Sequence, residues 1–344
     1  MKADPSFRTT LTAIWERLLK RPHIGIEEDF FELGGDPSLA VVLFAEIARV
    51  CGRRLPPEMI YVAPTINSLA ALLEKPVPPR FPPLVLLKNG TRQPTIFITH
   101  GLGASISELF EVVNHIRSKH PIYGMQAKGI DGFGEPSVSI EEMAKYFLKA
   151  VKRFQPCGPY CLIGYSLGGL VTLEMAQRLS ASGDLVGLLA MLDSYPHAAF
   201  LPSKERFRLL RRRIRTRVTR AFNSRLQEEI SATLESTAGA ELPASRSTRN
   251  LDSLSGASSP GQYLENMQSA LLRYRPRFYR GKVRFVQAAI GTRFPENPAT
   301  VWGHLIEQIE IQTVPSDHRG MITTHAKNLG RMLSTYIEEE LPEL

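Results

Sequence analysis

Beyond residue 83 the chain alternates between short apolar runs, rich in β-branched residues, and longer segments with helical periodicity. The apolar runs lie at 84–87, 95–99, 122–125, 160–163, 188–192, 283–286 and 309–314. Helical periods separate most of them, for example over 140–154 and 170–179. Strands joined through helices pair in parallel, and the helices cover both faces of the sheet. The alternation therefore predicts an α/β domain with a mostly parallel sheet.

The residues before this domain have a different pattern. Apolar side chains recur at helical spacing from Phe7 to Leu18, and two further helices are expected, one from Pro37 to about residue 50 and one after Thr65 as its N-cap. Residues 76–83 contain five prolines, a composition typical of a stiff, extended linker. We therefore expect a small all-helical unit at 1–75, a linker at 76–83 and the α/β domain at 84–344.

One insertion interrupts the alternation, because residues 197–280 contain no strand pattern. Its first part predicts an amphipathic helix whose apolar side chains are Phe207, Leu210, Ile214, Val218 and Phe222. Between 204 and 225 there are ten basic side chains and one acidic one, so this segment accounts for the whole net charge of +8. A nucleic-acid-binding protein would spread its positive charge along a face or groove, so we expect no nucleic-acid partner. The basic face is either simply solvated, or its arginines dock an acidic domain or bind a phosphate group. Contact with an anionic membrane is the least favoured interpretation.

A serine lies between a predicted strand and a predicted helix, within Gly164–Gly169, which has the pattern G-x-S-x-G. A serine exposed on such a tight turn needs neighbours without a Cβ atom, since the backbone passes close by. The N-terminus of the following helix stabilises negative charge that develops near the serine. The spacing predicts that Ser166 is a nucleophile.

A nucleophilic serine needs a base and an acid that orients the base. His318 follows the last predicted strand, which places it at the edge of the sheet where the serine turn also opens. Asp193 ends the strand at 188–192, whereas no carboxylate follows the strand at 283–286. We therefore predict Ser166, Asp193 and His318 as the catalytic residues. Asp317 is the second choice for the acid, because side chains adjacent in sequence usually diverge.

Two backbone N–H groups are expected to stabilise an oxyanion: that of Leu167, directly after the serine, and that of Leu102, in the glycine-containing loop after the strand at 95–99. The sequence has no HExxH motif and no paired CxxC motif, so no metal is predicted.

With these residues identified, the chain resembles the terminal segment of a nonribosomal peptide synthetase or polyketide synthase, a carrier domain followed by a type I thioesterase. On the thioesterase side the resemblance rests on residues 100–103, 164–169, 192–196 and 315–318 and on Trp302. It implies an α/β-hydrolase fold in which the insertion at 197–280 is a helical lid over an acyl-binding cavity.

On the carrier side, residues 29–36 resemble the signature that precedes the serine bearing 4′-phosphopantetheine. Here the next residue is Pro37, and Ser38 comes one position late. Asp36 as N-cap and proline at the first helical position favour a helix start, which turns Ser38 about 100° round the helix from the usual attachment site. Either Ser38 is modified by a phosphopantetheinyl transferase, or the unit is a docking module and a partner carrier supplies the group.

The resemblance implies a thioesterase that releases an acyl or peptidyl chain by hydrolysis or cyclisation. Its expected partners are an acyl or peptidyl carrier protein and an upstream synthetase module. With these partners, the acidic domain that the basic face docks would be a carrier domain, and the phosphate that it binds would be that of phosphopantetheine. The alternatives are an editing thioesterase of type II, a general esterase with a degenerate carrier unit, and a non-enzymatic docking protein. The three cysteines and the lack of a signal peptide or membrane span favour a cytoplasmic location.

Overall fold

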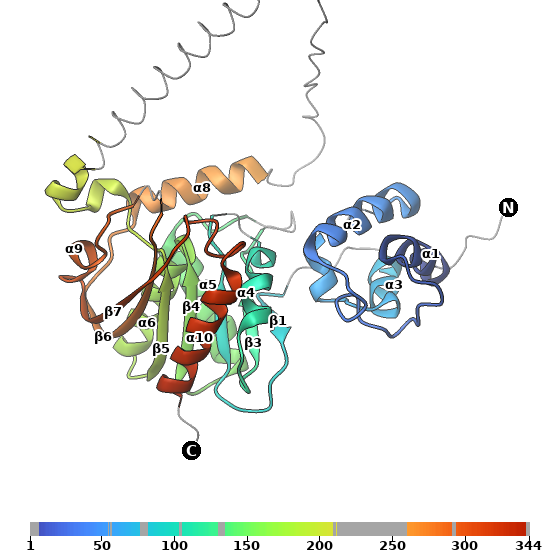
Figure 1. The fold of residues 1–344 in the computed structure, drawn as a ribbon, viewed down its shortest axis with the longest axis horizontal. Coiled ribbons are helices and arrows are strands. Elements are labelled where there is room, and N and C mark those ends of the chain that lie inside the picture. The colour runs from blue at the N-terminus through green and yellow to red at the C-terminus, as the bar shows by residue number, and fades with distance from the viewer. Residues whose placement is uncertain are drawn as a thin grey trace, which may run out of the picture.

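The structure is a computed structural model, and it describes residues 7–53, 55, 57–75, 82–102, 105–129, 135–208, 211, 260–290 and 294–341. Most of the insertion, including the greater part of the predicted basic helix, lies outside these residues, as does most of the predicted linker. Figure 1 shows a helical unit beside a domain in which helices surround a sheet.

The helical unit consists of three α-helices and one short 3-10 helix among the described residues: α1 (Phe7–Leu19), α2 (Pro37–Cys51), η1 (Pro57–Tyr61) and α3 (Ile66–Glu74). The predicted caps are confirmed, since the side chains of Asp36 and Thr65 accept hydrogen bonds from the N–H groups of Leu39 and Ser68. The core of the unit gathers around Trp15, which contacts Phe30 edge to face at 5.1 Å.

The described residues of the second domain form a seven-stranded sheet in the order β1-β3-β2-β4-β5-β6-β7. The strands are β1 (Leu84–Lys88), β2 (Ile96–Thr99), β3 (Ile122–Met125), β4 (Tyr160–Tyr165), β5 (Val186–Leu192), β6 (Tyr279–Ala288) and β7 (Ile306–Val314). β1 pairs with β3 in antiparallel fashion, and all other neighbours are parallel. The predicted α/β architecture with a mostly parallel sheet is confirmed.

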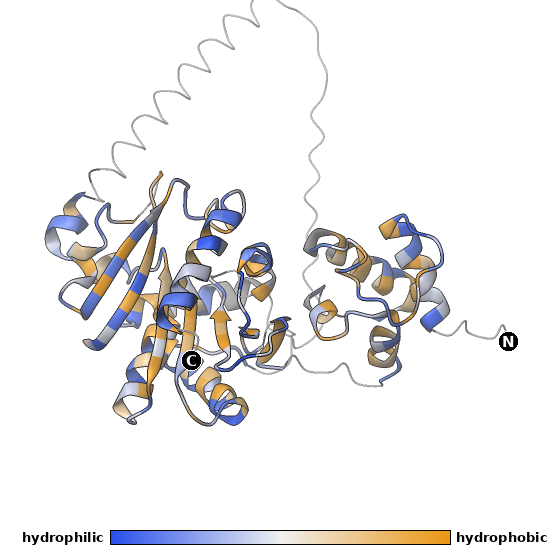
Figure 2. Cartoon of the chain, turned by 60° about the horizontal axis from the view of Figure 1, so that its bottom comes forward, coloured by the Kyte–Doolittle hydropathy of each residue, from blue (hydrophilic) through white to orange (hydrophobic). Residues whose placement is uncertain are grey.

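Helices cover both faces of this sheet. The described helices of this domain are η2 (Ile106–Leu109), α4 (Phe110–His115), α5 (Ile140–Phe154), α6 (Leu167–Ala181), η3 (Ala198–Phe200), α8 (Pro260–Arg273), α9 (Ala299–Trp302) and α10 (Ala326–Glu340). Alternate residues of β2 divide between the two cores: Phe97 packs with α5 and α6, whereas Ile96 and Ile98 pack with α4 and α10. Hydrophobic colour in Figure 2 is accordingly concentrated on the strands in the middle of the sheet.

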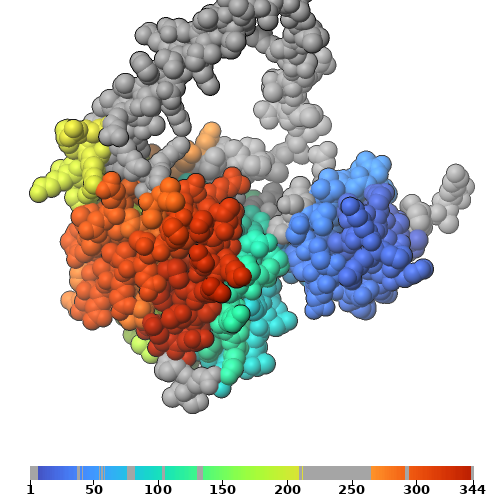
Figure 3. Space-filling view, in the orientation of Figure 1, coloured from blue at the N-terminus to red at the C-terminus, as the bar shows by residue number. Residues whose placement is uncertain are grey.

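The helical unit contacts the α/β domain through aromatic rings. Phe31 lies in the loop before α2, and its ring centroid is 4.8 Å from that of Phe110 at the start of α4. The ring centroid of Tyr61 is 5.6 Å from that of Phe110. Figure 3 shows the helical unit beside the surface formed by the first part of the α/β domain. The contact brings the loop that leads into α2 close to the segment that follows β2.

One sequence expectation needs correction. The strand predicted at 283–286 begins at Tyr279, inside the segment expected to contain no strand, and Tyr279 pairs with Ile306 of β7. Arg280, Gly281 and Lys282 interrupt the apolar pattern there, so backbone pairing with β7 extends the strand where side-chain pattern gives no signal.

None of the described helices combines the length and apolar character needed to cross a membrane.

Candidate active site

Ser166 lies on the turn between β4 and α6 with φ = 55° and ψ = −118°, a strained conformation for a residue with a side chain. Its N–H donates to the carbonyl of Leu192 at 2.8 Å, which ties the turn to the end of β5. A Cβ atom on Gly164 would come within 2.3 Å of the Gly168 carbonyl oxygen, and one on Gly168 within 2.4 Å of the His100 carbonyl oxygen. Glycines on both sides are therefore what lets the chain turn this sharply.

His318 follows β7, and its imidazole lies between the other two predicted residues. Its Nε2 atom is 3.0 Å from Ser166 Oγ, and its Nδ1 atom is 2.7 Å from Asp193 Oδ2. The ring stacks on Tyr165 with centroids 4.9 Å apart, and the Tyr165 hydroxyl donates to the His318 carbonyl at 2.9 Å. Neighbouring groups thus hold the imidazole in a single orientation.

Asp193 is fully buried at the end of β5 and has a positive φ of 46°. Its backbone N–H donates to the Val286 carbonyl at 2.7 Å, and its Oδ1 atom accepts the N–H of Ala288 at 3.2 Å. The end of β6 therefore holds one carboxylate oxygen and leaves the other for His318. Because Nδ1 faces a carboxylate, it carries the proton, and Nε2 is the acceptor that faces the serine.

Asp317, the second choice for the acid, makes a different hydrogen bond. Asp317 Oδ1 accepts the N–H of Gly320 at 2.6 Å and so closes the turn that follows β7. The predicted divergence of adjacent side chains is therefore observed at residues 317 and 318.

Of the two predicted oxyanion donors, Leu167 directly follows Ser166, and Leu102 directly follows Gly101, which lies beside Ser166. Leu167 is the first residue of α6, so its N–H belongs to the unpaired end of that helix. Leu102 follows Gly101, and a Cβ atom on Gly101 would lie 3.2 Å from Ser166 Cβ. Gly103 and Ala104, which complete this loop, lie outside the described residues.

Two side chains hold the Gly101 backbone: His100, which lies in the segment 100–103 named from the sequence, and Glu108, which the sequence did not single out. His100 Nδ1 is 2.8 Å from the Gly101 carbonyl oxygen, and Glu108 Oε1 accepts the Gly101 N–H at 2.5 Å. Complete burial lowers the pKa of His100 to about 4, so its ring is neutral and must carry its proton on Nδ1. Burial also raises the pKa of Glu108, against the effects of the Gly101 N–H, His318 and Arg319.

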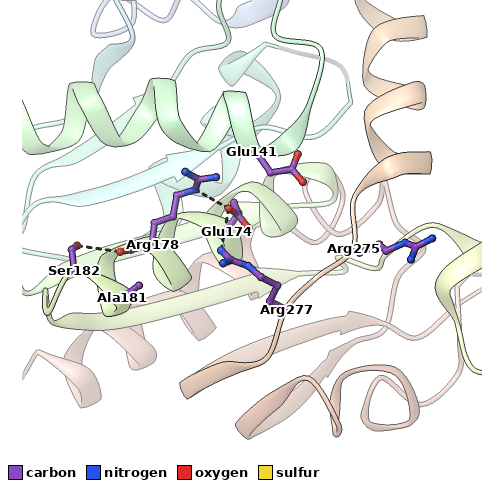
Figure 4. Close-up of a pocket in the computed structure, with 7 residues that line it drawn as sticks. All are labelled: Glu141, Glu174, Arg178, Ala181, Ser182, Arg275 and Arg277. Atoms are coloured by element: carbon purple, nitrogen blue, oxygen red, sulfur yellow. Dashed lines mark hydrogen bonds and ion pairs between the residues drawn. The ribbon is translucent and has the colours of Figure 1, made fainter.

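A separate pocket of about 470 Å³ opens between α6 and the segment that joins α8 to β6. Figure 4 shows Glu174 in it between two arginines, Arg178 at 2.7 Å and Arg277 at 3.4 Å. The Tyr274 hydroxyl also donates to Glu174 at 3.3 Å. The buried Glu174 carboxylate therefore links α6 to the segment between α8 and β6, where the insertion ends.

At the predicted attachment site, α2 begins with Pro37 and has Asp36 as its N-cap. Ser38 is therefore the second residue of the helix, and the side chains of both residues 37 and 38 lie outside the described part of the chain.

No group of three or more His, Cys, Asp or Glu side chains that could hold a metal ion occurs among the described residues.

Comparisons with known proteins agree with both halves of the chain. The family model for the thioesterase domain matches residues 94–337, and that for the phosphopantetheine attachment site matches residues 9–73, which links the helical unit to 4′-phosphopantetheine. The fold as a whole resembles the crystal structure of holo-AB3403, a four-domain nonribosomal peptide synthetase bound to AMP and glycine. That match has a TM-score of 0.57 and 22% identity, and it covers 100% of this chain and 26% of the other.

Curated relatives are synthetases. A dimodular nonribosomal peptide synthase from Bacillus subtilis (strain 168) is 37% identical over 196 residues, which cover 57% of this chain and 8% of the relative. Indigoidine synthase from Dickeya dadantii (strain 3937) is 35% identical over 180 residues, which cover 52% of this chain and 12% of the relative. The matched region is therefore a small part of each relative's length. Since the thioesterase family model matches well over half of the sequence, the chain belongs to the thioesterase-domain family.

Proposed function

We propose that this protein releases an acyl or peptidyl chain from a phosphopantetheine thioester, with Ser166 as nucleophile, His318 as base and Asp193 as the acid that orients the base. The observation that carries the proposal is the unbroken series of contacts from Asp193 Oδ2 to His318 Nδ1 and from His318 Nε2 to Ser166 Oγ, at 2.7 and 3.0 Å. Both lie within hydrogen-bonding distance, so a proton can pass directly from the serine to the imidazole.

In the first step His318 Nε2 takes the proton of the Ser166 hydroxyl while Oγ attacks the thioester carbonyl carbon. The carbonyl oxygen becomes an oxyanion, which the N–H groups of Leu102 and Leu167 stabilise. One such donor is typically worth about 3–4 kcal/mol in the transition state. The carbon–sulfur bond then breaks, and His318 returns its proton to the leaving thiol.

The acyl chain is now an ester of Ser166. His318 takes a proton from water, or from a hydroxyl or amine within the acyl chain, and that nucleophile attacks the ester carbonyl. Collapse of the second tetrahedral intermediate returns the proton to Ser166 Oγ and frees a linear acid or a cyclic product. The mass of the product distinguishes hydrolysis from cyclisation, because cyclisation does not add water.

The source of the thioester depends on the start of α2. 4′-Phosphopantetheine supplies a flexible thiol that carries the acyl chain. Pro37 has no hydroxyl to attach it, and Ser38 offers one at the next helical position. The position that normally bears the group therefore does not fit it, which favours supply in trans by a partner carrier of an upstream synthetase module.

Incubation with coenzyme A and a promiscuous phosphopantetheinyl transferase, followed by intact mass measurement, tests this supply route. We expect no added mass. An added phosphopantetheine that is lost in the Ser38→Ala variant would instead make Ser38 the attachment residue and the chain self-loading.

Replacement of Ser166 by alanine tests the proposed chemistry. We expect this variant to lose both thioester turnover and labelling by a fluorophosphonate, with its thermal unfolding unchanged. Labelling that persists in the variant would contradict the assignment of the nucleophile.

Competing substrates distinguish the proposal from its two enzymatic alternatives. A releasing thioesterase prefers acyl-pantetheine thioesters to oxyesters of equal chain length, whereas a general esterase accepts both. An editing enzyme would hydrolyse short acyl groups, such as acetyl, faster than long acyl or peptidyl chains. A preference for long thioesters therefore supports release.

A further inference from the structure

The loop after β2 is fixed by side chains at the residue that precedes the proposed donor Leu102. Gly101 gives its N–H to Glu108 Oε1 and receives a hydrogen bond from His100 at its carbonyl oxygen. That carbonyl shares a planar trans peptide with the Leu102 N–H, so the two groups point in opposite directions. Whatever holds Gly101 therefore also sets the direction of the Leu102 N–H.

Glu108 belongs to η2 and extends to this loop. Its carboxylate and the side chain of Ser166 both lie close to Gly101. A Cβ atom on Gly101 would be 3.3 Å from Glu108 Oε1 and 3.2 Å from Ser166 Cβ. The glycine thus separates the carboxylate from the nucleophile, and any larger residue at 101 would press on both. Glu108 is half-buried, so its contact with the loop is partly shielded from water.

The charged and titratable groups that interact with Glu108 are His318 and Arg319 from the loop after β7 and Tyr165 from β4. Burial favours the neutral form of the Glu108 carboxyl and raises its pKa, while His318, Arg319 and the Gly101 N–H favour the ionised form.

We propose that Glu108 is a positioning residue of the active site, which holds the Gly101–Leu102 peptide in the orientation that the oxyanion requires. This inference rests on the proposed thioesterase function. The hydrogen bond from the Gly101 N–H needs only an acceptor at residue 108.

Two substitutions test this hydrogen bond. Glu108→Gln keeps an oxygen acceptor for the Gly101 N–H but removes the charge, and Glu108→Met keeps the length and removes both. Glu111→Gln and Glu111→Met are matched controls, because Glu111 is an exposed carboxylate on α4.

For Glu108→Met we expect kcat to fall about 10- to 100-fold with KM within twofold of the wild type, less than the loss of a whole oxyanion donor. For Glu108→Gln we expect kcat at the optimum within threefold of the wild type. Both Glu111 variants should match the wild type.

The rate of fluorophosphonate labelling gives a readout that needs no natural substrate. The phosphoryl oxygen of the label accepts hydrogen bonds from the same two N–H groups, those of Leu102 and Leu167. We expect Glu108→Met to label at least tenfold more slowly and Glu108→Gln to label at nearly the wild-type rate. If wild-type protein labels but hydrolyses no thioester, the proposed substrate is wrong, and the labelling rates still test Glu108.

Wild-type kcat and labelling rate in a folded Glu108→Met variant would overturn the positioning role, as would a loss confined to KM. If Glu108→Met does not fold, Glu108→Gln decides the matter: a large fall in kcat despite the retained acceptor contradicts the proposal.

Discussion

The imidazole of His318 lies 2.7 Å from the carboxylate of Asp193, although the two residues are 125 positions apart in the chain. Asp193 is held at this place by the end of β6, through the Val286 carbonyl and the Ala288 N–H. The pair therefore depends on the pairing of β5 with β6 and on the loop that follows β7.

Replacement of Asp193 by asparagine should lower kcat by about three to four orders of magnitude, because an amide no longer fixes the proton on Nδ1 or offsets the charge of the imidazolium. KM should change little, since Asp193 is buried behind His318. Steady-state kinetics on an acyl-pantetheine thioester measures both constants. The control is Asp317→Asn, which alters only a turn and should retain activity; equal losses in the two variants would argue against the assignment.

His100 should make the protein sensitive to acid. Its pKa is about 4 in the folded protein, against about 6.5 in an unfolded chain, because burial disfavours the charged ring. Above pH 6.5 the ring is neutral in both states. As the pH falls from 6.5 to 4 only the unfolded chain takes up the proton, so stability is lost, up to about 3 kcal/mol.

A His100→Asn variant removes this titration while keeping a donor near the Gly101 carbonyl. We expect its free energy of unfolding in urea to fall less than that of the wild type between pH 6.5 and 4. Parallel pH curves for the two proteins would show that His100 does not contribute.

Glu174 should contribute to stability rather than catalysis. Its buried carboxylate accepts hydrogen bonds from Arg178 and Tyr274 and pairs with Arg277. Both arginines are partly exposed, so the cost of removing the carboxylate should be about 1–3 kcal/mol, below that of a fully buried pair. Urea unfolding of Glu174→Gln measures this cost. Glu141→Gln, at another carboxylate of the same pocket, is the control, and equal effects would contradict the prediction.

The contact between Phe31 and Phe110 should hold the helical unit against α4. Aromatic pairs contribute about 0.5–1.5 kcal/mol beyond the area they bury. Phe31→Ala should therefore increase the radius of gyration measured by small-angle scattering without unfolding either domain. Val42→Ala is the control, because Val42 is an exposed side chain on α2. An unchanged radius in Phe31→Ala would show that the ring contact does not hold the unit.

Much of the fold could be predicted because its strands and helices have strong side-chain patterns. The bounds of β3 (Ile122–Met125) and α5 (Ile140–Phe154) were predicted as the structure has them. The start of β6 could not be predicted, because Arg280 and Lys282 are not apolar. The strand there depends on its pairing with β7.

The meeting of Ser166, Asp193 and His318 could be anticipated because parallel strands end at a common edge of the sheet. Their catalytic roles remain a proposal. Glu108 could not be found in this way, because its contact depends on the path of the loop between β2 and η2, which no periodic pattern encodes. The contact of Phe31 with Phe110 likewise joins two separately folded units, and neither sequence pattern indicates it.

The central claim is that the acyl chain passes through an ester on Ser166. Acid quenching during turnover of an acyl-pantetheine thioester, followed by digestion and mass spectrometry, locates that ester directly. We predict an acyl adduct on the peptide that contains Ser166, which disappears in Ser166→Ala together with turnover. Full turnover by Ser166→Ala, or an acyl adduct on another residue, would contradict the account.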